Sequence, residues 1–415
     1  MAMKESGIEW VGLIPDGWKI AKNNRLFNIS KQLVNENWKN TQLLSLTKSG
    51  IIEKNINDGG GKQPESFGTY QYVEKDDIVL CLFDIDVSAV FSDRSKYDGM
   101  ISPAYRVMKC TDAILPVYAK WWFDAVNIGR YYLIYTKSLR KTIDADGFGN
   151  ILSVVPPLSE QQAIADYLDK TCSKIDEIIA EAKASIDEYK ELKQSVIFEA
   201  VTKGLDKNVE MKQCSVNWLD EIPSTWESIR LKYLLTEINN RSKTGTEQPL
   251  SVSQVMGVVP SYMIAVANPT ASYVGQKIVE PNDIVFNKLK AHLGVFFMSK
   301  YHGLVSPDYA VYRTNDKVIP KYLEYLFHTS ACISEFKKYI SGVAEGLMRL
   351  YTSNLFNIRI CLPKVDEQIK IVEYVENKVE LFNSLISEKE SLINDLEAYK
   401  KSLIYEVVTG KRRVV

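Results

Sequence analysis

The chain has few of the residues that catalysis or metal binding usually requires. Its three histidines, His292, His302 and His328, all lie in the second half. Its six cysteines are far apart and form no CxxC pair, which favours isolated buried thiols over a disulfide framework or a zinc site. We therefore expect a reducing, cytoplasmic location and no metal bound by this chain.

Signals of membrane proteins and nucleotide-binding enzymes are also missing from the sequence. No stretch approaches the roughly 18 consecutive apolar residues of a membrane span, and the first residues, MAMKESGIEW, contain no apolar leader core. Glycines 59–61 lack the spacing of a phosphate-binding loop. Residues 268–271 (NPTA) depart from the Asn-Pro-Pro-Tyr loop of amino-methyltransferases. We expect no membrane association, no cofactor and no catalytic residues; an enzyme with an unrecognised site is kept as an alternative.

What the sequence does contain is a repeat with a period of about 207 residues. EWVGLIPDGW near the start matches NWLDEIPSTW, and KYDGMISPAYRV from Lys96 matches KYHGLVSPDYAV from Lys300. Later, SEQQAIADYLDK matches DEQIKIVEYVEN, and QSVIFEAVTKG matches KSLIYEVVTGK. Ordered blocks of this kind indicate a tandem duplication.

Each copy divides into a globular module and a long helix. Residues 1–156 and 206–362 alternate short β-branched and aromatic runs with turns, which predicts two compact α+β modules. Residues 157–205 and 363–415 begin near prolines and continue for at least 35–40 residues without proline or glycine. The four segments carry net charges of +1, −4, +3 and −1 in chain order, so the modules are the more basic parts.

Heptad spacing predicts that the two helices form a coiled coil, each on the order of 55 Å long. Apolar residues recur every seven positions and in neighbouring positions, with one interruption at Lys389. Because such a stripe needs a partner and the copies share one chain, we expect the helices to pair antiparallel. The stripe consists of Leu168, Ile175, Ile178, Ile179, Ala182, Ile186, Tyr189, Leu192 and Val196, then Val375, Val379, Phe382, Leu385, Ile386, Leu392, Ile393, Leu396 and Leu403.

These blocks resemble the specificity (HsdS) subunits of type I restriction-modification systems over essentially the whole chain. The resemblance depends on the repeated Ile-Pro-x-x-Trp and Gly-x-x-Ser-Pro-x-Tyr motifs and on the helix starts and ends. The second copy departs modestly, with Leu-Pro-Lys at 362–364 where the first has Pro-Pro-Leu at 156–158. The matching motif residues are Ile14, Trp18, Gly99, Ser102, Pro103 and Tyr105, and Ile222, Trp226, Gly303, Ser306, Pro307 and Tyr309.

The resemblance implies a non-catalytic subunit that recognises a bipartite site in double-stranded DNA. Residues 1–156 and 206–362 would be target-recognition domains, one for each half-site. Helical spacers 157–205 and 363–415 would set the gap and dock two methyltransferase subunits, which restriction-translocase subunits join. S-adenosylmethionine, Mg and ATP would be bound by these partners and not by this chain. The alternative is a duplicated coiled-coil scaffold that joins protein partners without DNA.

Charge differences between the copies indicate where DNA would be contacted. Residues 288–292 contain two lysines and a histidine, whereas the matching 82–86 contain two aspartates, and a symmetric scaffold would not need this divergence. Basic residues also lie before each long helix and in a turn near Lys48. Each position could instead be an ordinary solvated loop, an alternative that the sequence leaves open. The candidate DNA-binding residues are Lys48, Lys137, Arg140, Lys141, Lys288, Lys290, His292 and Arg349.

Overall fold

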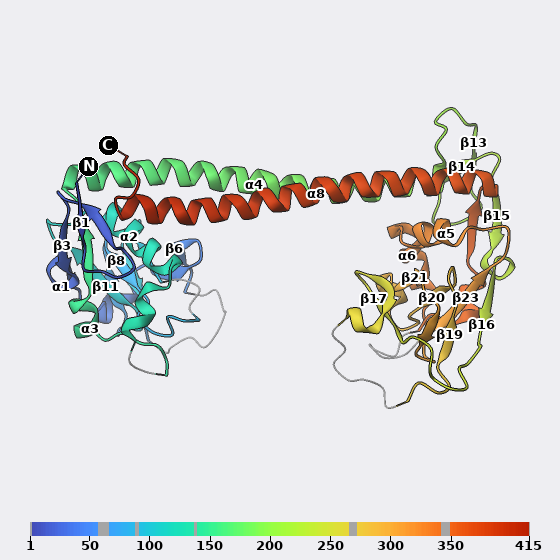
Figure 1. Ribbon diagram of the computed structural model, residues 1–415, viewed down its shortest axis with the longest axis horizontal. Helices are drawn as coiled ribbons and strands as arrows, with labels where there is room; N and C mark the ends of the chain where they lie inside the picture. The colour runs from blue at the N-terminus through green and yellow to red at the C-terminus, as the bar shows by residue number, and fades with distance from the viewer. Residues whose placement is uncertain are drawn as a thin grey trace. The chain divides into compact units, whose positions relative to one another are not determined.

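The chain forms two compact units, each of which contains a globular head and half of each long helix. The computed structural model describes residues 2–56, 66–87, 91–136, 139–264, 272–341 and 349–414. Unit 1 consists of Met1–Lys183 and Glu390–Val415, and unit 2 of Ala184–Lys389. The long helices are α4 (Leu158–Lys203) and α8 (Val365–Val408). We call residues 2–157 the first head and residues 204–364 the second head (Figure 1).

The first head combines two four-stranded sheets, ordered β6-β5-β10-β7 and β4-β11-β8-β9, with two-stranded ribbons β1-β2 and β12-β3. The three helices of its described residues are α1 (Asn23–Leu26), α2 (Pro116–Ile128) and α3 (Ala145–Asn150), with 3-10 turns η1 (Asn35–Asn40) and η2 (Tyr131–Tyr135). Its strands are β1 (Met3–Glu5), β2 (Leu13–Pro15), β3 (Lys19–Lys22), β4 (Phe27–Ile29), β5 (Leu43–Thr47), β6 (Gly50–Lys54), β7 (Gln71–Val73), β8 (Ile78–Leu80), β9 (Ser92–Arg94), β10 (Gly99–Ile101), β11 (Arg106–Cys110) and β12 (Leu152–Val155).

The second head repeats this plan, with β16-β23-β20-β21 in place of β4-β11-β8-β9 and with ribbons β13-β14, β15-β24, β17-β18 and β19-β22. Its helices are α5 (Pro320–Phe327), α6 (Ser330–Lys338) and α7 (Thr352–Leu355), with 3-10 turns η3 (Leu231–Tyr233), η4 (Ser261–Met263) and η5 (Ala291–Leu293). Its strands are β13 (Met211–Gln213), β14 (Glu221–Pro223), β15 (Glu227–Arg230), β16 (Leu235–Ile238), β17 (Leu250–Ser253), β18 (Gly257–Pro260), β19 (Lys277–Val279), β20 (Ile284–Phe286), β21 (Phe296–Met298), β22 (Gly303–Val305), β23 (Ala310–Thr314) and β24 (Arg359–Leu362). The predicted duplicated α+β fold is confirmed.

Two of the repeated motifs contact each other at the start of each long helix. The indole of Trp18, in the Ile-Pro-x-x-Trp motif, donates a hydrogen bond of 2.9 Å to Glu160 at the start of α4. In the second copy Trp226 donates to Glu367 at 3.1 Å. Both indoles are buried, so each pair joins the head firmly to its own helix. The tryptophan and the glutamate therefore recur in both copies because they join each head to its helix.

A buried glutamine completes each of these helix starts. The Gln161 side chain accepts a hydrogen bond from the Leu115 amide at 2.7 Å and donates to the carbonyls of Ala113 and Pro156. Gln368 makes the same three bonds in the second copy, to Ile319, Lys317 and Pro363. Both glutamines are fully buried, and a buried amide without partners would be costly. The SEQQ and DEQ blocks therefore fix the direction in which each helix leaves its head.

Each head also binds the end of the helix that belongs to the other copy. The Tyr118 hydroxyl donates to the carbonyl of Val408 at the end of α8, within unit 1. In unit 2 the Tyr322 hydroxyl donates to the carbonyl of Val201, near the end of α4. The compact units therefore differ from the sequence repeats, because each head is completed by both helices.

Contacts along the helices show that they pair antiparallel within each unit. In unit 1 the end of α8 lies beside the first head, and further back along α8 Lys400 pairs with Asp176 at 2.6 Å. In unit 2 Lys193 donates to Asn383 at 3.0 Å, and the rings of Tyr189 and Phe382 pack 6.5 Å apart. The predicted antiparallel coiled coil is confirmed.

The buried stripe of the coiled coil differs in part from the predicted one. Most predicted stripe residues are buried or half-buried, including Leu168, Ile175 and Leu403. Ile178 and Leu192 on α4, and Leu392 on α8, are instead exposed. The correction follows from geometry: a stripe alternating three and four residues passes through Ile179, and its neighbour Ile178 faces about 100° away. No helix in the described residues is long and apolar enough to cross a membrane.

Candidate nucleic-acid interface

In the first head, the two loops that the sequence analysis singled out lie against each other. The Ile143 amide donates to the carbonyl of Leu82 at 2.9 Å, and the Asp84 amide donates to the carbonyl of Arg140 at 2.8 Å. Loop 82–87 continues from β8, and residues 139–144 lead toward the first long helix. The structure thus brings Arg140 and Lys141 together with the aspartate-containing loop.

Arg140 forms a two-point ion pair with Asp84. Its Nε and Nη2 atoms donate to the two carboxylate oxygens at 3.2 and 2.8 Å. These hydrogen bonds hold the pKa of the Asp84 carboxyl below its usual value. The Arg140 side chain nevertheless stays 75% exposed, so its charge is at the surface but already has a partner.

Two residues of this loop pair have backbone conformations that side chains rarely adopt. Asp84 has φ of 47° and Lys141 has φ of 45°. Left-handed conformations cost energy in residues other than glycine and often occur at functional sites. Lys141 is exposed, whereas Lys137 lies outside the described residues. The first head therefore offers Arg140 and Lys141 on a tightly bonded surface loop.

The equivalent loops of the second head also meet, but their charges differ. The Leu350 amide donates to the carbonyl of Lys288 at 3.1 Å, which places Arg349 beside that lysine. By this bond Leu350 matches Ile143, so Arg349 takes the position of Thr142 and not that of Arg140. Three of the four predicted residues in this head are lysines or arginines: Lys288, Lys290 and Arg349.

Lys290 and His292 lie on a short turn after β20, at the positions of Asp84 and Asp86. The Asn287 side chain accepts hydrogen bonds from the amides of Leu289 and Lys290 and so shapes the turn. Lys290 is exposed and His292 is half-buried. Within the described part of the chain no carboxylate forms an ion pair with Lys290. This turn is therefore the more attractive of the two loop pairs to a polyanion.

Lys48 lies at the tip of the β5–β6 hairpin. The tip is held by Gly50, with φ of 93°, and by the Ile51 amide, which donates to Asp93 at 2.8 Å. Lys48 is exposed. The matching hairpin of the second head, β17–β18, has Gln254, Val255 and Met256 at its tip. This hairpin is not among the predicted DNA contacts; its signal in the sequence is the pair of adjacent apolar residues Val255 and Met256 before Gly257.

The repeated Ser-Pro-x-Tyr motif forms a structural turn. The Tyr105 amide donates to the Ser102 carbonyl, and Gln71 donates to the Tyr105 carbonyl at 2.8 Å. In the second head Lys277 replaces that glutamine and donates to Tyr309 at 2.8 Å. Burial lowers the pKa of the Lys277 ammonium, with a smaller contribution from the nearby charges of Lys288 and Arg241. A buried cation thus lies behind the candidate interface of the second head.

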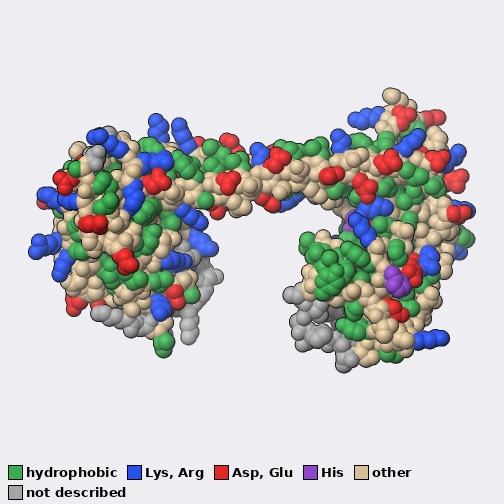
Figure 2. Space-filling model, viewed as in Figure 1, with side chains coloured by type: hydrophobic (Ala, Val, Ile, Leu, Met, Phe, Trp, Pro, Cys, Tyr) green, Lys and Arg blue, Asp and Glu red, His purple; other side chains and the backbone are tan. Residues whose placement is uncertain are grey.

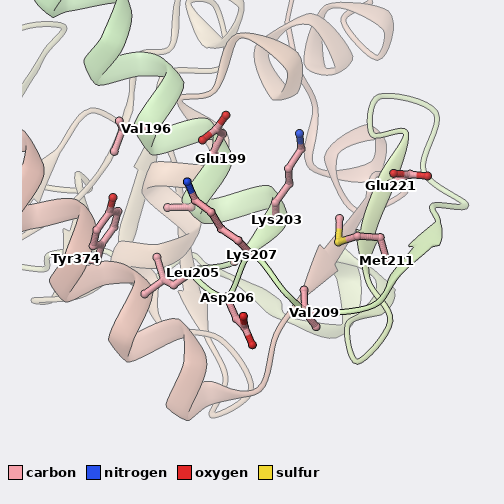
Figure 3. Close-up of a pocket in the computed structure, with 12 residues that line it drawn as sticks. Val196, Glu199, Lys203, Leu205, Asp206, Lys207, Val209, Met211, Glu221 and Tyr374 are labelled. Atoms are coloured by element: carbon pink, nitrogen blue, oxygen red, sulfur yellow. The ribbon is translucent and has the colours of Figure 1, made fainter.

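A cavity of about 640 Å³ in unit 2 lies outside this interface. Figure 3 shows its lining: Glu199 and Lys203 come from the end of α4, Lys207 from the segment that follows, and Tyr374 from α8. Its charges are mixed, and it has no cluster suited to catalysis. Among the described residues no group of three or more His, Cys, Asp or Glu side chains could hold a metal ion.

Comparisons with known proteins agree with this architecture. Residues 223–395 match the family model of the type I restriction modification DNA specificity domain. The specificity subunit of the type I restriction enzyme EcoKI from Escherichia coli (strain K12) is 23% identical over 238 residues, or 54% of this chain. That match spans about half (49%) of the curated relative's length.

Two solved structures share the fold of nearly the whole chain. One belongs to a study of complex assembly and conformational transition of the type I restriction-modification system; it has a TM-score of 0.72 and 14% identity, and the match covers 96% of this chain and 99% of that one. The other is the HsdS subunit from Thermoanaerobacter tengcongensis, with a TM-score of 0.57, 14% identity and coverage of 96% and 98%. Together these findings identify residues 223–395 as similar to a type I restriction modification DNA specificity domain, and show that nearly the whole chain shares the fold of solved proteins from type I restriction-modification systems.

Proposed function

We propose that the chain gives a type I restriction-modification complex its DNA specificity by recognising a bipartite site, one half with each head. The observation that carries this proposal is the contrast between equivalent loops. Heads of the same fold carry an Asp84–Arg140 ion pair in one copy and Lys290 with His292 in the other. Equal folds with unlike surface loops are suited to two different half-sites on one duplex.

The two loop pairs would take different shares of the interaction. The cationic residues of the second head are suited to phosphate oxygens, which position the duplex without specifying sequence. Arginine and asparagine or glutamine side chains in such loops can hydrogen-bond base edges in the major groove. We propose Lys48, Lys137, Arg140, Lys141, Lys288, Lys290, His292 and Arg349 as contact residues.

Catalysis would belong to partner subunits. Two methyltransferase subunits would dock on the helical regions, and restriction-translocase subunits would join them in the cytoplasm. S-adenosylmethionine, Mg and ATP would be bound by those partners. The heads would hold the duplex so that a methyltransferase subunit can rotate an adenine out of the stack and methylate it. The EcoKI relative and the structure of a type I assembly support this arrangement.

The test is single-molecule sequencing of DNA from a host without such a system that expresses this chain with its cognate methyltransferase subunit. The control expresses the methyltransferase alone. We expect a bipartite methyladenine motif only when this chain is present. A soluble, co-purifying complex that yields no motif would contradict the proposal and favour a protein scaffold.

A further inference from the structure

We propose that the tip of the β17–β18 hairpin, residues Gln254, Val255 and Met256, enters a groove of the second half-site and contacts bases through its apolar side chains. This inference extends the proposed function and depends on it. It assigns a recognition element to a segment that the charged residues alone would not indicate.

The hairpin tip exposes large apolar side chains on a well-ordered turn. Val255 is 92% exposed and Met256 is 51% exposed. The Ser253 hydroxyl accepts hydrogen bonds from the amides of both residues at 3.2 Å. The following Gly257 has φ of 72°, as the turn requires. The backbone of the tip is therefore fixed while its side chains face outward.

The tip is joined to the cationic turn of the second head. The Gln254 side chain donates to the carbonyl of Leu293 at 3.2 Å, and Leu293 directly follows His292. Leu293 is itself 48% exposed and extends the apolar surface. Figure 2 shows hydrophobic side chains gathered on the viewed face of the second head, around the position of β17 in Figure 1. The exposed apolar tip and the turn that carries Lys290 and His292 are thus neighbours in the second head.

This combination of charges and apolar groups fits a duplex better than a protein surface. Lys290 and His292 are suited to phosphates, and charged residues are depleted at the core of protein interfaces. A two-stranded β-ribbon is narrow enough to enter the major groove, where apolar side chains contact thymine methyl groups. Charge complementarity therefore identifies double-stranded DNA as the occupant.

The first head supplies an internal comparison. Its matching hairpin, β5–β6, has Lys48 and Ser49 at the tip, both exposed and polar. The hairpins therefore differ in chemistry while their positions in the fold agree. That is the pattern expected of elements that recognise different bases.

The test compares the purified complex carrying wild-type chain with one carrying V255S and M256S together. Affinity is measured for a duplex that carries the motif identified by methylation mapping of the wild-type complex. It is also measured for duplexes in which each base pair of that motif is replaced in turn. We expect about a tenfold loss of affinity for the intact site, with lost discrimination at one or more positions of the second half-site only. Discrimination in the first half-site should not change.

Matched variants separate base contact from folding. Tyr233→Ser removes another exposed side chain of the same head, 59% exposed, and should leave discrimination unchanged. The double variant V255I and M256L keeps the tip apolar and should retain discrimination in the second half-site. It therefore tests the inference even if the serine variant folds poorly.

Unchanged discrimination by the serine variant would overturn the inference. A loss of methyltransferase binding while DNA discrimination persists would also overturn it, because the hairpin tip would then be a protein-docking surface. If the wild-type chain yields no bipartite motif at all, the proposed function itself has failed, and the two failures are distinguishable.

Discussion

At the scale of single residues, Asp84 partly neutralises the positive charge that Arg140 brings to the surface of the first head. The carboxylate lies 2.8 Å from a guanidinium that is mostly exposed. Exposed pairs contribute little to folding stability. In the proposed function, the pair would lower non-specific attraction to phosphates while keeping a planar donor group at the surface.

Replacing Asp84 with Asn should therefore raise DNA affinity and reduce discrimination in the first half-site. We expect about a two- to fivefold gain at low salt, since exposed ion pairs are worth roughly 0.2–1 kcal/mol. If Arg140 gains a phosphate contact, the slope of log affinity against log salt should steepen by about 0.9. Binding titrations over a range of salt concentrations measure both effects.

A suitable control removes a carboxylate of the same charge elsewhere in the first head. Glu74 pairs with Lys109 at 2.7 Å, and both side chains are about half exposed. Glu74→Gln changes the net charge equally but not at the loop pair. An equal gain in both variants would mean that only long-range charge matters. No gain in D84N would remove Arg140 from the contact residues.

At the scale of elements, the ends of the long helices stabilise the units through their contacts with the heads. Gly410 follows the end of α8 with φ of 73°, packed against Pro15 and Trp18 of the first head. A side chain there would be strained in its backbone and would collide with the Ile-Pro-x-x-Trp motif. The contact stabilises unit 1 only while that position stays a glycine.

Gly410→Val should consequently destabilise unit 1 strongly. We expect a loss of about 2–4 kcal/mol, from the left-handed backbone and from overpacking. Thermal and denaturant unfolding of the full chain measure it. Gly7→Ala is the control, because Gly7 also has positive φ, at 72°, but has no atoms within 4 Å of an added Cβ. Equal losses in both variants would show that backbone strain alone matters.

At the scale of the whole molecule, the proposed function predicts that the length of the paired helices sets the gap between the two half-sites. Removing seven residues from each of α4 and α8 takes away about 10 Å of helix. At about 3.4 Å per base pair, the gap in the recognised site should shorten by about 3 base pairs. Methylation mapping of this variant measures the gap. An unchanged gap in a folded, active complex would show that the length of the helices does not set the gap.

Much of the architecture follows from the sequence by itself. The duplication, the α+β modules and the two long helices were predictable because repeats, strand runs and heptads are local patterns. The pairing direction was predictable because one chain carries both helices. The exposed positions of Ile178 and Leu192 were also predictable, because a strict alternation of three and four residues along the helix excludes both.

Only the tertiary structure decided how the candidate site is assembled. Asp84 and Arg140 are 56 residues apart in the chain, and nothing local in the sequence indicates that the carboxylate already neutralises that arginine. The hairpin tip at Val255 is similar: its contact with Leu293 spans 39 residues. The sequence determines which groups are available, whereas long-range backbone pairing determines which of them meet, because that pairing depends on the packing of the whole head.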